Sequence, residues 1–129
     1  MTREEEIKSL IRRSKNFLET AEFQTSRGFY DLAAFSLEQA LQLHLKAKLL
    51  AEGIDYPRTH SVRTLLKMLS ELASEEKKIQ IKKVIENYLL ELGMLEDAYI
   101  TSRYITREFT KEELEKLAKA VREIIKNVW

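Results

Sequence analysis

The stretch from residue 30 to 52 most constrains what this chain can fold into, because it predicts a helix that is apolar around most of its circumference. Such a helix must be covered on several sides, so we expect it at the centre of a helical bundle. It would be roughly 33 Å long. One side carries Ala33, Leu37, Ala40, Leu41, His44, Ala47 and Lys48, and Leu32, Phe35, Leu43, Leu45, Leu49 and Leu50 widen the apolar surface.

Four other segments predict helices that would pack around this central one. Apolar residues repeat at spacings of three and four over residues 3–26, 61–73, 75–101 and 111–127. Short connections between long amphipathic helices favour antiparallel neighbours. We therefore expect an all-α fold, an antiparallel up-and-down bundle of four main helices plus a shorter one, formed by a single domain over residues 1–129.

Several polar residues have the positions expected of helix caps. Thr2 with Glu5, and Thr110 with Glu113, have the spacing of a capping box at the start of a helix. Ser74 is a candidate N-cap for the helix that follows it. These residues fix the predicted starts of the first, fourth and last helices.

Glycine and proline are scarce, which disfavours a β-sandwich or barrel. Gly28 and Gly53 are placed to end helices in the left-handed conformation. Pro57 predicts a loop of defined path between the second and third helices. Gly93 lies inside the fourth predicted helix, where it indicates a kink or the close approach of another helix.

The composition fits a folded protein with a heavily charged surface, since 44% of residues are hydrophobic and 33% are charged. Cysteine is absent, which excludes disulfides, a thiol nucleophile and cysteine-containing zinc sites. No apolar leader or membrane-spanning stretch is recognisable, so a cytoplasmic protein without membrane contact is expected. Abundant Lys, Glu and Leu beside few Asn and Gln are typical of a thermophile.

The net charge of +1, from 22 basic and 21 acidic residues, gives no general support for nucleic-acid binding. A local basic patch remains open. Lys77, Lys78, Lys82 and Lys83 form a basic cluster that is either a solvated helix face or a surface that attracts RNA.

Three stretches carry candidate chemistry, and the first is Phe35–Leu49 in the central helix. We interpret it as a core helix with a polar seam, in which His44 pairs with a carbonyl or carboxylate. No metal site is predicted, because the chain has only two histidines and lacks metal-binding spacings. The seam, predicted on solvated or boundary faces, comprises Glu38, Gln39, Gln42, Lys46 and Lys48.

The second stretch is the loop that contains Tyr56, Pro57, Arg58, Thr59 and His60. His60 or Thr59 can cap the helix that follows. In the functional interpretation, Arg58 and His60 instead line a cleft at the end of the bundle, where histidine could do acid–base chemistry near neutral pH.

The third stretch runs from Asp97 to Phe109 and has the most functional appearance. Arginine suits bidentate recognition of phosphate, and tyrosine can stack on a base. Alternatively, the tyrosines complete the core and the arginines pair with Asp97 and Glu108. The candidate ligand-binding residues of this stretch are Asp97, Tyr99, Arg103, Tyr104 and Arg107.

Together the three stretches resemble the HEPN family of helical domains over nearly the whole chain. The matching residues are the apolar run into Glu38-Gln39-Ala40 and on to Lys46-Ala47, then Tyr56-Pro57, Thr59-His60-Ser61 and Leu65-Leu66, then Tyr99-Ile-Thr-Ser-Arg103-Tyr104. The resemblance implies a helical bundle that often forms a homodimer. It also implies either RNA cleavage or partnership with a minimal nucleotidyltransferase in systems of the toxin–antitoxin type, and nucleotide binding in the cleft.

The ribonuclease members of that family carry an arginine followed four to six residues later by a histidine. Arg103 has the position of that arginine, but no histidine occurs after His60. Arginine alone is a poor base, because it stays protonated. Our leading hypothesis is thus a non-catalytic module that binds a nucleotide, a nucleotidyltransferase partner, or both. The alternatives are a metal-independent ribonuclease that uses Arg103 with a displaced His60, and a purely structural dimerisation bundle.

Overall fold

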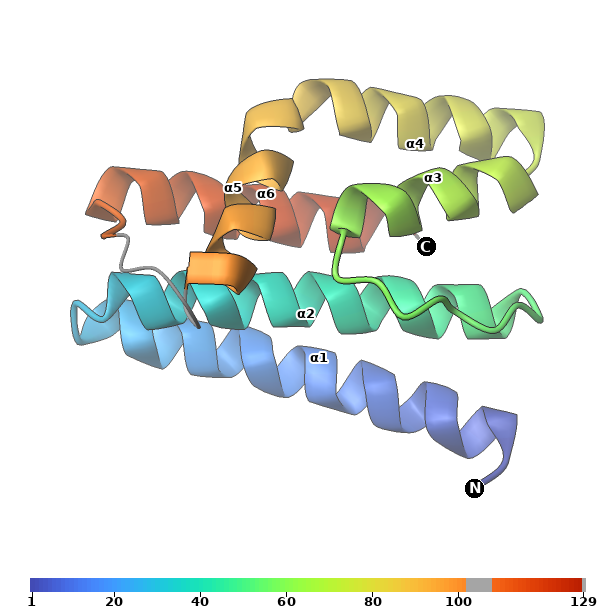
Figure 1. Ribbon diagram of the computed structural model, residues 1–129, viewed down its shortest axis with the longest axis horizontal. Coiled ribbons are helices and arrows are strands. Elements are labelled where there is room, and N and C mark those ends of the chain that lie inside the picture. Colours follow the sequence, from blue (N-terminus) through green and yellow to red (C-terminus); the bar gives the residue numbers. More distant parts are fainter. Residues whose placement is uncertain (102–107, 129) are drawn as a thin grey trace.

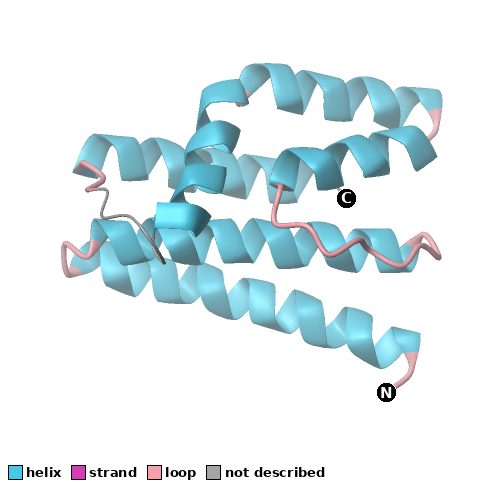
Figure 2. Cartoon of the chain, viewed as in Figure 1, coloured by secondary structure: helices cyan, strands magenta, loops and turns pink. Residues whose placement is uncertain are grey.

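All regular structure in residues 1–101 and 108–128, the part of the chain that this computed structural model describes, is helical. The helices pack as a bundle in which α1 runs antiparallel to α2, α3 and α6 run in the same direction as α2, and α5 crosses the others (Figures 1 and 2). The predicted all-α bundle is therefore confirmed. The helices are α1 (Arg3–Ser26), α2 (Tyr30–Ala51), α3 (Val62–Leu72), α4 (Glu75–Asn87), α5 (Leu89–Thr101) and α6 (Lys111–Asn127).

Helix α2 is the centre of the bundle, as its apolar circumference predicts. It packs against α1, α3, α5 and α6, which approach it from different sides (Figure 1). Four leucines repeat at intervals of four residues along it and are at most 1% exposed: Leu37, Leu41, Leu45 and Leu49. Their burial against every neighbouring helix supplies much of the hydrophobic free energy of folding.

The fourth predicted helix, over residues 75–101, is in fact two helices. The backbone of Tyr88, at φ −120° and ψ 29°, ends α4, and α5 leaves in a different direction (Figure 1). The apolar spacing continues through the break because both helices bury an apolar face. Helix α4 buries its face against α3, and α5 buries its face against α2. Gly93 marks neither the break nor a close approach, since a Cβ added there would meet nothing within 4 Å.

The predicted helix caps are present. The Thr2 hydroxyl accepts a hydrogen bond from the Glu5 amide, and Thr110 forms a reciprocal capping box with Glu113. Gly28 adopts the predicted left-handed conformation, with φ at 78°. The chain leaves α1 through a tight turn there, because the amide after the glycine bonds back to Gln24. This turn makes α1 and α2 antiparallel neighbours.

Among the helices described, none is long and apolar enough to cross a membrane.

Replacement of Leu41 by alanine tests the role of α2. This side chain is 0% exposed, so the substitution should lower the free energy of unfolding by about 2–5 kcal/mol. Leu32→Ala on the same helix is the matched control, because Leu32 is 54% exposed and its truncation should cost under about 1 kcal/mol. Urea unfolding followed by circular dichroism measures both. Equal losses in the two variants would contradict the central position of α2.

Candidate functional site

The loop between α2 and α3 places side chains over the middle of the bundle. It runs back along α2 before it enters α3, and α5 descends beside it on the same face (Figure 1). The hydroxyl of Tyr56 donates a hydrogen bond of 3.1 Å to Glu6 of α1, which ties the loop to the first helix. At its other end, the loop places His60 in contact with Tyr99 of α5.

His60 and Tyr99 form an aromatic pair at the junction of this loop with α5. Their ring centroids are 4.1 Å apart with an angle of 20° between the planes, and the Tyr99 oxygen lies 2.9 Å from Nε2 of His60. Tyr99 is 9% exposed, whereas His60 is exposed. Phe35 of α2, which is half-buried, lies beside Tyr99, with ring centroids 6.2 Å apart. The pair therefore presents a solvent-accessible aromatic surface on a fixed base.

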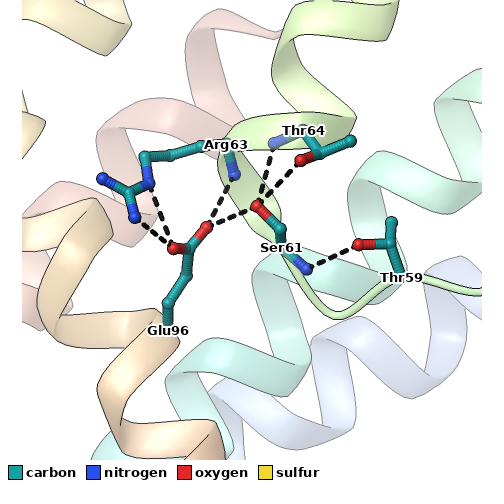
Figure 3. Close-up of polar contacts among 5 residues, drawn as sticks. All are labelled: Thr59, Ser61, Arg63, Thr64 and Glu96. Carbon is teal, nitrogen blue, oxygen red and sulfur yellow. Dashed lines mark hydrogen bonds and ion pairs between the residues drawn. The ribbon is translucent and has the colours of Figure 1, made fainter.

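The start of α3 is joined to α5 through Glu96, as Figure 3 shows. The hydroxyl of Ser61 donates to Glu96 at 2.6 Å, and at the same time it accepts from the Thr64 amide as the N-cap. Arg63 donates to the other carboxylate oxygen from its guanidinium group. Thr59 accepts from the Ser61 amide, so Ser61 and Thr59, rather than His60, do the capping. His60 remains directed at Tyr99.

The Glu96 carboxylate is stabilised in its ionised form by these contacts. Burial alone would raise its pKa, but the hydrogen bonds from Arg63 and Ser61 and the charge of Arg63 outweigh that effect and lower it. The pKa of Arg63 is raised by the same pair. Because the carboxylate side chain is only 17% exposed, this network fixes the position of α5 relative to α3.

A row of polar side chains on α2 lies in the interior, where the sequence predicted a solvated or boundary face. Glu38 is 0% exposed and Gln42 is 4% exposed. Glu38 accepts hydrogen bonds of 2.8 Å from Gln39 and from Gln42, and Gln42 accepts one of 2.9 Å from Lys46. The prediction was wrong for Glu38 and Gln42 because the loop and α5 cover this face of α2 as well.

The carboxyl group of Glu38 titrates near neutral pH. Burial raises its pKa from 4.5 to about 7, against the opposing effect of the bonds from Gln42 and Gln39 and of the Lys46 charge. The charge of Glu96, on α5, also raises it. A group of this kind can exchange a proton in the physiological range.

His44, the other histidine, is structural, as the sequence indicated. Its Nε2 atom lies 3.2 Å from the carbonyl oxygen of Val128, so it joins α2 to the end of α6. Burial lowers its pKa, an effect that the Val128 bond partly opposes, which favours the neutral ring. His44 therefore belongs to the core and lies apart from the His60 loop.

The structure brings together part of the predicted ligand-binding set. His60 and Tyr99 are in contact, while Arg58 and Asp97 are exposed, on the loop and on α5. Asp97 follows Glu96 directly in α5, and its charge contributes to the raised pKa of Arg63. The remaining three predicted residues, Arg103, Tyr104 and Arg107, lie outside the described residues.

Sequence reasoning did not assign Glu38, Gln42, Ser61 or Glu96 to the site. A signal for the first two was available, because Glu38, Gln42 and Lys46 recur at intervals of four on the most apolar helix of the chain. A polar row on such a helix must be covered and hydrogen-bonded. The pairing of Ser61 with Glu96 spans 35 residues and has no local pattern.

The described residues contain no group of three histidine, cysteine or acidic side chains that could hold a metal ion.

Comparison with known proteins supports the bundle and its family. A family model described as "HEPN domain" matches residues 7–128. The crystal structure of an archaeal HEPN homologue superposes with a TM-score of 0.65 at 22% identity, covering 95% of this chain and 93% of that one. At this identity the likeness shows the fold alone. No curated protein matches the chain.

Glu38 should make the free energy of unfolding depend on pH. Its pKa is about 7 in the folded state and 4.5 when unfolded, so the folded chain retains a proton that the unfolded chain releases. The associated stability is present below pH 4.5 and is lost as pH rises through about 7, by at most ~3 kcal/mol. Glu38→Gln removes this loss, so the variant should gain stability relative to the wild type between pH 5 and pH 8. Denaturant unfolding at both values tests this, and a constant difference would exclude the role of Glu38.

Ser61→Ala should destabilise the protein more than Ser74→Ala, although both serines are N-caps. Ser74 accepts from the Lys77 amide alone, so its loss costs about 1 kcal/mol. Ser61 also donates to the ionised Glu96, a bond of a class worth about 1.5–3 kcal/mol. Thermal and urea unfolding of the two variants give the difference directly. Similar losses would show that the bond to Glu96 adds nothing to stability.

Proposed function

The chain belongs to the HEPN domain family, and on that premise we propose that it is a non-catalytic member that binds a nucleotide. The binding face is the one where the loop before α3 meets α5. The family membership also confirms the resemblance predicted from the three stretches of sequence.

The observation that carries this proposal is the aromatic pair of His60 and Tyr99. The imidazole of His60 is exposed and stacks on the phenol ring of Tyr99, so an aromatic group lies at the surface on a buried base. Bases stack on such groups with about 1–3 kcal/mol each, largely independent of sequence. The neighbouring Glu96 network holds α5 in place, so the platform is formed before the ligand arrives. A preformed site lowers the cost of ordering on binding.

Two features of the histidines favour binding over catalysis. Cleavage of RNA without a metal needs a proton acceptor for the 2′-hydroxyl and a donor for the leaving oxygen. His44 is committed to the Val128 carbonyl, and the ring of His60 is engaged by Tyr99. Neither follows Arg103 in the sequence at the spacing of the ribonuclease members.

The other predicted ligand-binding residues, Arg58, Asp97, Arg103, Tyr104 and Arg107, belong to the same proposal. Arg58 and Asp97 are on the loop and on the helix that present the aromatic pair. Arginine side chains beside a stacking surface are suited to the phosphates of a nucleotide. A minimal nucleotidyltransferase, itself a nucleotide-handling protein, is the partner that family membership suggests for this face.

Isothermal titration with ATP and GTP tests the proposal. His60→Ala removes the exposed ring, so its dissociation constant should rise roughly 5- to 150-fold. Lys119→Ala on α6 is the control, since it removes an exposed charge away from the loop and should change nothing. An unchanged constant in His60→Ala would remove the aromatic pair from the site. If the protein binds no nucleotide but binds a co-expressed nucleotidyltransferase tightly, the proposed face is a site for that protein partner and not for a nucleotide.

Incubation with labelled RNA in EDTA tests the non-catalytic part. We expect no cleavage by the wild type. Cleavage that both His60→Ala and Arg103→Ala abolish would establish a ribonuclease with a displaced histidine in place of a binding module.

A further inference from the structure

Residues 53–58, the first part of the loop between α2 and α3, are held to the bundle by shallow contacts. Each of them is half-buried or exposed. Asp55 pairs with Arg3 of α1 at 3.4 Å, but its side chain is 90% exposed, and surface ion pairs of this kind add little stability. Tyr56 packs against the core, and its hydroxyl donates to Glu6 at 3.1 Å. Little apolar surface therefore opposes the lifting of this segment from α2.

The polar row of α2, which comprises Glu38, Gln42 and Lys46, begins beneath this segment. The Nζ atom of Lys46 lies 5.2 Å from the centroid of the Tyr56 ring and donates to Gln42 at 2.9 Å. Gln42 donates in turn to Glu38 at 2.8 Å. The row is thus continuous from the loop contact at Lys46 to the fully buried carboxyl group of Glu38.

The loop follows the row toward its buried end. It runs back along α2 (Figure 1), and it reaches α5 where His60 contacts Tyr99. The Tyr99 ring lies beside Phe35, which is three residues before Glu38 in α2. Contacts at both ends therefore place the loop along the row.

Glu38 is the member of the row that can change its charge near neutral pH. Both of its carboxylate oxygens accept from amide groups, one from Gln39 and one from Gln42. Among the described residues, no cation lies within ion-pair distance of it. A covered and unpaired carboxyl group retains its proton to a higher pH than one in water, and burial raises the pKa of Glu38 from 4.5 to about 7.

The surrounding charges do not compensate for this burial. Lys46 of α2 favours the ionised form of Glu38, whereas Glu96 of α5, which is bound by Arg63 of α3, opposes it. Helix α6 meets α2 on another side, at His44. The loop and α1 contribute titratable or charged side chains that are exposed or already engaged, namely Arg3, Glu6, Asp55, Arg58 and His60. Ionisation of Glu38 therefore creates a charge that water stabilises better than the closed loop does.

We propose that residues 53–58 form a lid over the polar row, and that the lid lifts when Glu38 ionises. A lifted lid lets water reach the row, and a state that hydrates Glu38 is favoured by the loss of its proton. Lifting disrupts fewer buried contacts than unfolding does, so it is the first response to the new charge. The lifted lid uncovers an ammonium, an amide and a carboxylate group. Because no ligand takes part, the lid is independent of the proposed function.

The pKa of Glu38 under the lid and in water sets the size and the sign of the effect. With values of about 7 and 4.5, the ratio of lifted to closed molecules rises at most about tenfold between pH 6 and pH 8. The proton stabilises the closed lid fully below pH 4.5, and this stabilisation is lost as pH rises through about 7. Closed molecules therefore predominate in acid, and lifted molecules accumulate above neutral pH.

NMR of the Lys46 side chain measures the lid directly. In the closed state the Tyr56 ring lies against the ammonium group, so its ring current shifts the ε-methylene protons of Lys46 to high field. We expect this shift to diminish between about pH 5.5 and pH 8.5, with the midpoint given by the carboxyl carbon of Glu38. The backbone amides of residues 53–58 should move with the same midpoint. The exposed Lys119 is the reference, and its ε-methylene protons should not follow this titration.

Two variants separate the proton from the lid. Glu38→Gln keeps the size of the side chain and cannot ionise, so Lys46 should keep its high-field shift at every pH. Tyr56→Phe keeps the ring and removes the hydrogen bond to Glu6, so the lid lifts more easily and the midpoint of Glu38 should fall. Tyr30→Phe is the matched control, because Tyr30 is a half-buried tyrosine outside the loop. Circular dichroism melts establish that each variant is folded.

Three results would overturn the lid. The first is a Lys46 shift that stays constant in the wild type while the carboxyl carbon of Glu38 titrates, which decides the matter even if a variant does not fold. The second is a pH response of the wild-type size in Glu38→Gln. The third is an equal fall of the Glu38 midpoint in Tyr56→Phe and Tyr30→Phe, since the effect would then not come from the loop.

Discussion

The fold depends on one constraint, which is that α2 is too apolar to leave more than a small part of its circumference in water. Its leucines are at most 1% exposed at Leu37, Leu41 and Leu45, and α1, α3, α5 and α6 all pack on it. Burial of a leucine side chain is worth about 1.5–3 kcal/mol, so each neighbour is held by the surface it removes from water. The long loop before α3 follows from the same constraint, since it runs along α2 and ties down with Tyr56.

Covering most of α2 also buries Glu38 and Gln42, and this gives the candidate site its character. No buried side-chain nitrogen or oxygen in the described part of the chain lacks a hydrogen-bond partner. Glu38 is satisfied by amide groups rather than by an ion pair, so no paired cation offsets its burial and its pKa is raised to about 7. An apolar residue at position 38 would pack equally well and would avoid the free-energy cost of removing a carboxyl group from water. The polar row is therefore better explained by what it does for Lys46 and the loop than by stability.

Local patterns predicted most of the helices, and long-range packing decided what they could not predict. The starts of α1 and α6 follow from N-capping residues, Thr2 and Thr110, whose hydrogen-bond partners are three positions further along the chain. The break at Tyr88 was missed because the apolar spacing continues through it although the packing partner changes. The contact of His60 with Tyr99 joins residues 39 positions apart, and the hydrogen bond from Ser61 to Glu96 joins residues 35 positions apart. No local sequence pattern encodes contacts at such separations.

The break between α4 and α5 has a consequence for how the bundle opens. Helix α4 buries only Ile81 and Val84, whereas Ile79 is 53% exposed, so little apolar surface holds this helix in place. Local unfolding takes the segments with the fewest buried contacts first. Amide hydrogens of α4 should therefore exchange with solvent far sooner than those of α2. Because α5 has its own packing on α2, α4 can fray without disturbing the face that carries Tyr99.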